Sequence, residues 1–76
     1  MNEITLQGIR TMLTRRIQIN LAKNIRRREY VYGRALYFKL AKEFTSSSYK
    51  EIGDLVDRDH ASVIHGLKVF EMLVLH

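Results

Sequence analysis

The stretch that decides the fold is residues 48–66, which read SYKEIGDLVDRDHASVIHG. Ser48 and Glu51 have the spacing of a capping box, in which the serine hydroxyl accepts from the glutamate amide and the glutamate carboxylate accepts from the serine amide. A short helix is therefore expected to begin after Ser48, with three apolar residues facing inward: Ile52, Leu55 and Val56. Residues 57–59 predict a tight turn, in which either aspartate can cap a following helix.

The helix after this turn is expected to run from Asp59 to near Leu75. Its apolar stripe repeats at helical spacing and consists of Val63, Leu67, Phe70 and Val74. A short helix, a turn of about three residues and a longer helix have the shape of a helix-turn-helix, whose second helix presents its first residues to DNA. Here those residues are small or polar and cannot form a core: Arg58, Asp59, His60, Ala61 and Ser62.

The pattern upstream of residue 48 is also helical nearly throughout. Residues 30–44 predict an amphipathic helix whose apolar face is Leu36, Tyr37, Leu40, Ala41 and Phe44. A first helix is expected over residues 5–13, with a stripe formed by Ile4, Ile9, Met12 and Leu13. Residues 14–16 then predict a turn, residues 17–25 a turn and a short helix, and residues 26–29 a basic loop. No strand pattern is convincing, so the sequence predicts a single all-α domain over residues 1–76, a bundle of four to five helices.

Composition and charge narrow the class of partner. The 76 residues contain no cysteine, which excludes disulfides and cysteine-ligated zinc. No apolar run approaches the roughly 20 residues that cross a bilayer, and no signal peptide is visible, so a cytoplasmic protein is expected. Residues 1–50 carry eleven basic and three acidic groups, a net of +8, whereas residues 51–76 carry two basic and five acidic groups, a net of −3. This concentration of positive charge favours a polyanion, with nucleic acid first and an anionic membrane surface bound by residues 4–28 as another reading.

Three motifs together resemble a known family. They are LAKEFT at residues 40–45, EIG at residues 51–53 and RDHASVIHG at residues 58–66. This set resembles the C-terminal DNA-binding domain of the bacterial replication initiator DnaA, whose pattern is roughly L-A-[RK]-E-L-T, then E-I-G, then R-D-H-T-T-V-x-H-A. The resemblance is strongest over residues 30–73. It implies an all-α helix-turn-helix domain, of the Trp-repressor-like kind, that binds double-stranded DNA and associates with the nucleoid.

The resemblance also implies roles for individual residues. The major-groove positions are Tyr49, Lys50, Arg58, Asp59, His60, Ala61 and Ser62. Arg26 falls on the minor-groove arginine, with Arg27 and Arg28 beside it. Positions suited to phosphate contact are Arg34, Lys42, Ser46, Ser47, His65 and Lys68. Asp59 has two compatible roles, because an aspartate at this place can cap the helix and can also accept from a cytosine amino group.

The sequence departs from the family pattern at three places. The family's Gly-Gly ahead of Arg-Asp-His is the single residue Asp57, so the turn is one residue shorter. Its Thr-Thr is Ala61-Ser62, and its Leu-Pro at the start of the preceding helix is Tyr49-Lys50. We therefore expect duplex binding with an altered target sequence.

Enzymatic and metal-dependent functions are not expected. Nothing resembles the phosphate loop G-x-x-x-x-G-K-[ST], so no ATPase activity is expected. His60 and His65 are five positions apart, which does not place two imidazoles on one helix face as a zinc site needs. Because Met1 opens the sequence, a free-standing small protein without a cofactor is expected. The alternative function is a protein-interaction module that binds a replication partner through the apolar segment of residues 72–75.

Overall fold

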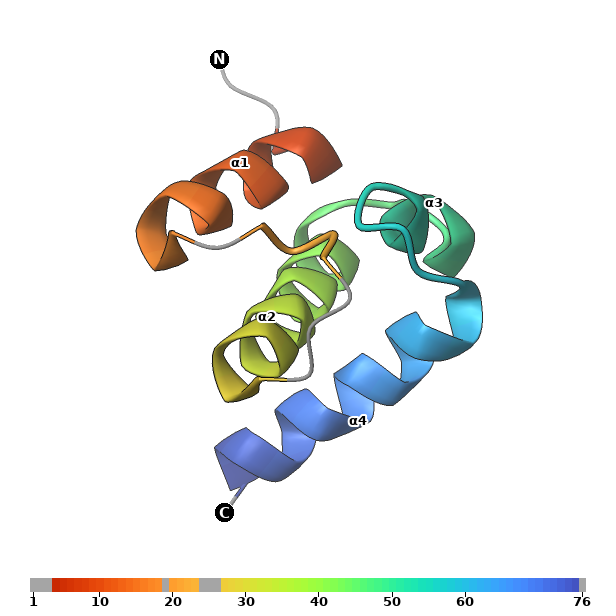
Figure 1. Cartoon of the computed structure of the whole chain (residues 1–76). Helices are drawn as coiled ribbons and strands as arrows, with labels where there is room; N and C mark the ends of the chain where they lie inside the picture. Colours follow the sequence, from red (N-terminus) through yellow and green to blue (C-terminus); the bar gives the residue numbers. More distant parts are fainter. Residues whose placement is uncertain (1–3, 19, 24–26, 76) are drawn as a thin grey trace.

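A computed structural model describes residues 4–18, 20–23 and 27–75 of the chain (Figure 1). Within these ranges there are four helices and no strand, which confirms the all-α prediction. The helices are α1 (Leu6–Ile17), α2 (Arg28–Phe44), α3 (Tyr49–Asp54) and α4 (His60–Leu75). The three elements from α2 onward begin and end within two residues of their predicted bounds.

Helix α1 is longer than its sequence predicted. The hydroxyl of Thr5 caps it by accepting from the amide of Gly8 at 3.0 Å. The turn expected at residues 14–16 is wrong, because the helix continues to Ile17 and ends at Gln18, whose φ of 62° is left-handed. Ile9, Leu13 and Ile17 are spaced four apart on the inner face, so the polar residues between them lie on the outer face of the same helix.

The segment after α1 forms a turn and not a helix. The side-chain oxygen of Asn20 accepts from the amide of Ala22 at 3.0 Å, and its carbonyl accepts from the amide of Lys23 at 3.1 Å. The short helix expected over residues 17–25 is therefore absent from the residues described there. Leu21 nevertheless joins the core from this turn. Arg26, the expected minor-groove arginine, lies outside the described residues.

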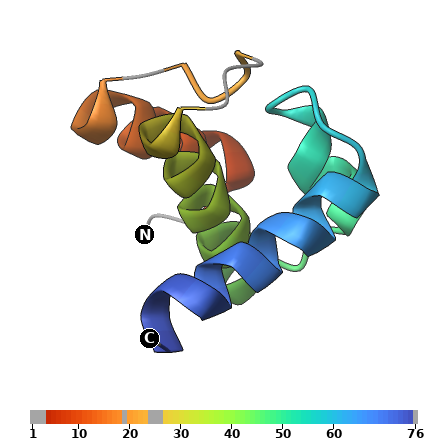
Figure 2. The same cartoon turned by 60° about the horizontal axis from the view of Figure 1, so that its bottom comes forward.

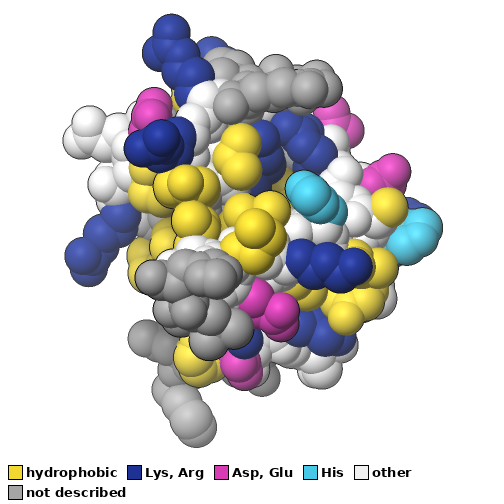
Figure 3. All heavy atoms as spheres, turned by 90° about the horizontal axis from the view of Figure 1, so that it is seen from below, with side chains coloured by type: hydrophobic (Ala, Val, Ile, Leu, Met, Phe, Trp, Pro, Cys, Tyr) yellow, Lys and Arg dark blue, Asp and Glu magenta, His cyan; other side chains and the backbone are white. Residues whose placement is uncertain are grey.

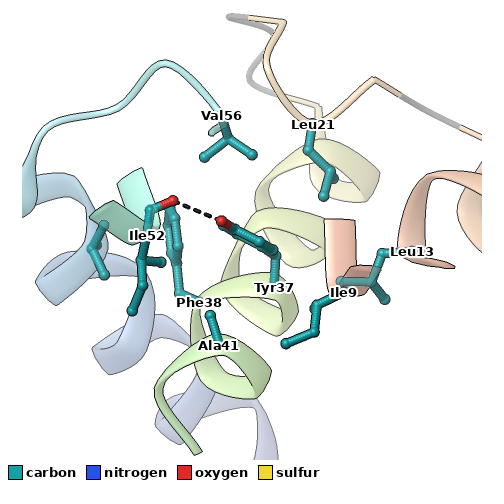
Figure 4. Packing of buried hydrophobic residues seen from close by; sticks show 9 residues of the cluster. Ile9, Leu13, Leu21, Tyr37, Phe38, Ala41, Ile52 and Val56 are labelled. Carbon is teal, nitrogen blue, oxygen red and sulfur yellow. Dashed lines mark hydrogen bonds between the residues drawn. The ribbon is translucent and has the colours of Figure 1, made fainter. Parts of the chain in front are cut away.

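Helix α2 lies at the centre and packs against α1, α3 and α4 (Figures 1 and 2). The core that it organises is shown in Figure 4. The buried hydroxyl of Tyr37 donates to the carbonyl of Ile52 at 2.8 Å, which fixes α3 to α2. Burial of Tyr37 raises the pKa of its phenol to about 12, against a smaller lowering by Arg10.

Two glycines allow close contact between helices. A Cβ on Gly66 would lie 2.6 Å from Cε2 of the buried Phe38, so α4 crosses α2 at this point with no room for a side chain. A Cβ on Gly53 would overlap the carbonyl oxygen of Arg58 and would lie 3.1 Å from its carbon. Gly53 therefore brings the backbone at the start of α4 directly onto α3.

Several apolar residues predicted to face the core are exposed. Ile4 is 55% exposed and Phe44 57% exposed, and the two line one open surface groove at the start of α1 and the end of α2. Phe44 is the last residue of α2 and lies six positions beyond Phe38, where α4 crosses α2 at Gly66. Met12, also predicted to belong to the apolar stripe of the first helix, is exposed as well.

Candidate nucleic-acid interface

Helix α3 begins at the predicted capping box. The amide of Glu51 donates to the Ser48 hydroxyl at 3.1 Å, and the amide of Ser48 donates to Oε1 of Glu51 at 2.8 Å. These bonds to Ser48 favour the ionised carboxylate and hold the pKa of Glu51 below its usual value. The box fixes the residue at which α3 begins, and hence the place of Tyr49 and Lys50 in its first turn.

The turn between α3 and α4 closes on Gly53. Its carbonyl accepts from the amides of Val56 at 3.0 Å and Arg58 at 2.9 Å. Between them Asp57 has a φ of 55°, a left-handed conformation that favours glycine and that aspartate tolerates better than most residues. One left-handed residue is thus enough to reverse the chain between the two helices.

Asp59 caps α4. Its Oδ1 accepts from the amide of Ser62 at 2.9 Å, which confirms its predicted capping role. The bonds to the amide and hydroxyl of Ser62 lower the pKa of this carboxyl. His60 and Ala61 are exposed and Ser62 is half-buried, so the first turn of α4 presents side chains to solvent.

The side chain of Arg58 turns back onto the backbone. One terminal guanidinium nitrogen donates to the carbonyls of Val56 at 3.2 Å and Asp57 at 2.9 Å. The other donates to the carbonyl of Lys23 at 3.1 Å. The same carbonyl accepts from Arg34 on α2 at 3.0 Å. The guanidinium groups of Arg34 and Arg58 therefore meet at the backbone of Lys23. These three basic residues form the cationic cluster.

An open groove runs beside this meeting point, between α2 and the first half of α4. Phe38 is among its apolar lining residues, and its polar lining residues are Arg34, Arg58, Asp59, Ser62 and His65. Burial, together with the charge of Arg58, lowers the pKa of Arg34. Figure 3 shows the face seen from below, on which histidine, lysine and arginine side chains lie among hydrophobic and acidic ones. The groove thus carries two arginines and one aspartate next to the exposed start of α4.

A family model described as the bacterial DnaA protein helix-turn-helix matches residues 12–69. This chain belongs to that family. It is also 33% identical to the chromosomal replication initiator protein DnaA of Flavobacterium psychrophilum, in a match covering 95% of this chain and 16% of that protein. The chain thus spans about a sixth of the length of this curated relative. No solved structure matches it.

In this DnaA-type helix-turn-helix, the other candidate residues form two further groups. The first lies near the start of α3, where the ammonium of Lys42 sits over the Tyr49 ring at 4.6 Å and Lys50 pairs with Asp54 at 3.1 Å. The hydroxyl of Thr45 donates to Ser47 at 3.0 Å, and Ser46 is exposed beside it. The second comprises the exposed residues Arg27 and Arg28 at the start of α2, with Arg27 as the N-cap residue. Lys68 is exposed on α4.

Sequence reasoning missed one member of the cationic cluster. Lys23 was not among the candidate residues, although it precedes the arginine triplet by three positions. Its side chain is exposed and its carbonyl joins Arg34 to Arg58. No helix in the described part of this DnaA-type domain is both long and apolar enough to cross a membrane.

Proposed function

We propose that this chain binds double-stranded DNA in a sequence-specific manner and acts in replication initiation or its regulation. The observation that carries the proposal is the exposed first turn of α4, with His60 and Ala61 open to solvent, beside the cationic cluster of Lys23, Arg34 and Arg58. An exposed helix start next to a positive groove suits a major-groove reader whose flanks meet phosphates. Family membership and the net charge of +5 support the same conclusion.

Affinity and discrimination come from different residues in this proposal. Phosphate contacts from Arg34, Lys42, His65 and Lys68 supply most of the affinity, which therefore falls steeply as salt rises. Base contacts from His60 and Ser62 supply discrimination, at about 1–3 kcal/mol for each well-placed pair. Asp59 serves as the helix cap and can also accept from a base, and Tyr49, Lys50 and Arg58 complete the proposed major-groove set. Arg26, Arg27 and Arg28 remain the proposed minor-groove residues.

The test is a comparison of two histidine variants that share a helix and a chemistry. Fluorescence anisotropy with a duplex selected from a random library, and with an unrelated duplex, gives specific and non-specific affinities. His60→Ala should lower affinity for the selected duplex while leaving non-specific affinity nearly unchanged. His65→Ala, the matched control, should weaken binding to both duplexes alike.

Two results would contradict these assignments. Wild-type protein that binds both duplexes equally weakly would argue against sequence-specific recognition. Loss of non-specific binding in His60→Ala, with no effect of His65→Ala, would reverse the two roles.

We also propose that the chain hydrolyses no ATP, because its 76 residues contain no phosphate-loop motif.

The end of α4 favours one second candidate function, a protein-interaction module. Met72 is 63% exposed and Leu73 43% exposed, so this part of the helix offers apolar side chains to solvent. The double variant Met72→Glu, Leu73→Lys should lose binding of a replication protein at this site and should retain duplex binding. Binding to purified initiator, measured by interferometry with this double variant as control, separates the two functions.

A further inference from the structure

We propose that Arg34 and Arg58 are positioning residues that hold the turn of residues 20–23 against the start of α4, and thereby place Lys23 within reach of the same duplex. This inference rests on the proposed DNA-binding function. It gives Arg58 a different task from base contact and Arg34 a different task from phosphate contact, and it adds Lys23 as a DNA-binding residue.

The geometry that carries the inference is a shared acceptor. Arg34 donates to the carbonyl of Lys23 from α2 at 3.0 Å, and Arg58 donates to it from the turn before α4 at 3.1 Å. A carbonyl oxygen has two lone pairs, so one oxygen can accept from both guanidinium groups. Arg34 lies 11 positions and Arg58 lies 35 positions from Lys23 in the sequence. Each bond therefore joins parts of the chain that are distant in sequence.

Arg58 is itself held in place by its own turn. Its donations to the carbonyls of Val56 and Asp57 fix the guanidinium against the backbone next to α4. Because the planar guanidinium presents several donors in a rigid fork, it can serve three carbonyls at once. The position of Lys23 therefore follows the position of the turn that leads into the recognition helix.

The shared acceptor also brings two positively charged groups together, the guanidinium groups of Arg34 and Arg58. Two guanidinium groups on one oxygen repel each other; burial chiefly lowers the pKa of Arg34, and the charge of Arg58 lowers it further. The groove beside them is lined by Arg34, Arg58 and Asp59, and Lys23, whose carbonyl joins the two arginines, is an exposed basic residue. A polyanion is the partner that such a concentration of charge fits best.

The test keeps every charge and changes only the donor geometry. The variant is Arg34→Lys with Arg58→Lys, because lysine retains the charge but lacks the planar fork. The matched control is Arg15→Lys with Arg16→Lys, at two exposed arginines near the end of α1. Since the chain has no cysteine, Lys23→Cys with Lys68→Cys provides two unique sites for spin labels.

The first measurement is made without DNA. Pulsed electron-spin resonance should give a narrow distance distribution between residues 23 and 68 in the wild-type background and in the control. The distribution should broaden in the Arg34→Lys, Arg58→Lys background. If that double variant fails to fold, Arg34→Lys alone, which leaves the bonds of Arg58 within its turn, should still broaden the distribution.

The second measurement is duplex affinity in unlabelled proteins that retain Lys23. The Arg34→Lys, Arg58→Lys variant should bind about tenfold more weakly than the control, with a salt slope shallower by about one phosphate contact. Unchanged distances with weaker binding would overturn the inference in favour of direct contact, and broadened distances with unchanged affinity would overturn it as well. Wild-type protein that binds no duplex would refute the proposed function, while the distance measurement would still decide the positioning role.

Discussion

Replacement of Gly53 by alanine tests how α3 is joined to α4. The new Cβ would overlap the carbonyl oxygen of Arg58 and would lie 3.2 Å from that of Asp59. Both neighbours are backbone atoms in the turn, so they cannot rotate away as the end of a side chain would. The chain between the helices must therefore move outward.

The expected loss of stability follows from three contributions. Overpacking of this kind costs about 1–3 kcal/mol. The outward shift also weakens the bonds from Val56 and Arg58 to the Gly53 carbonyl, at about 0.5–1.5 kcal/mol each. Alanine returns about 1 kcal/mol through its higher helix propensity. The net is a destabilisation of about 2–3 kcal/mol, which lowers the melting temperature of a domain this size by about 10–20 °C.

Thermal unfolding followed by circular dichroism measures this change, with Gly8→Ala as the control. A Cβ on Gly8 would lie 3.1 Å from the hydroxyl oxygen of Thr5, at the exposed start of α1, where a small side-chain adjustment suffices. The change in the free energy of unfolding should be on the order of 0.5 kcal/mol. The melting temperature of the control should therefore stay within a few degrees of the wild-type value. A Gly53→Ala protein that melts at or above the wild-type temperature would refute the packing argument.

Three further predictions concern single contacts. Tyr37→Phe should lower the free energy of unfolding by about 1–3 kcal/mol, because the Ile52 carbonyl loses its buried donor; titration of denaturant midpoints should also show that wild-type stability decreases as pH rises from 10 toward 12, while the variant stays level. Asp57→Ala should cost about 1 kcal/mol in urea unfolding and Asp57→Gly should not, since only glycine is unstrained at a φ of 55°; equal losses in both would contradict this. Glu51 and Asp59 have lowered pKa values, so their stabilising effect is present above the ordinary values of 4.5 and 3.8 and is lost as pH falls through and below them; a Glu51→Gln, Asp59→Asn protein, which keeps both caps, should show a smaller acid loss in melts from pH 6 to pH 2.5.

The fold was predictable where local signals agreed with each other. Ser48 and Glu51 mark the beginning of α3 by chemistry alone. The apolar spacing in α2 correctly placed Tyr37 and Ala41 in the core, but it missed Ala35 and Phe38 and wrongly included Phe44. The end of α1 was not predicted, because Arg15 and Arg16 were interpreted as a turn when they are the solvent side of a helix. The repeat of Ile9, Leu13 and Ile17 at helical spacing carried the correct signal.

The candidate site was predictable only in part. The capping role of Asp59 and the exposure of His60 follow from the position of α4 and its stripe. The convergence of Arg34 and Arg58 could not be predicted, because their common acceptor is a backbone carbonyl and leaves no mark in the amino-acid sequence. The base and phosphate contacts of the individual side chains stay predictions.

The choice of acceptor at residue 23 has an evolutionary consequence. Every amino acid brings a main-chain oxygen to its position, so substitutions at residue 23 leave the link to both arginines intact. Substitution is constrained instead at residues 34 and 58, because loss of either guanidinium removes one of the two hydrogen bonds to this carbonyl. Homologues that carry this device should therefore retain arginine at residues 34 and 58, whereas residue 23 needs only a basic side chain for its contact with the duplex.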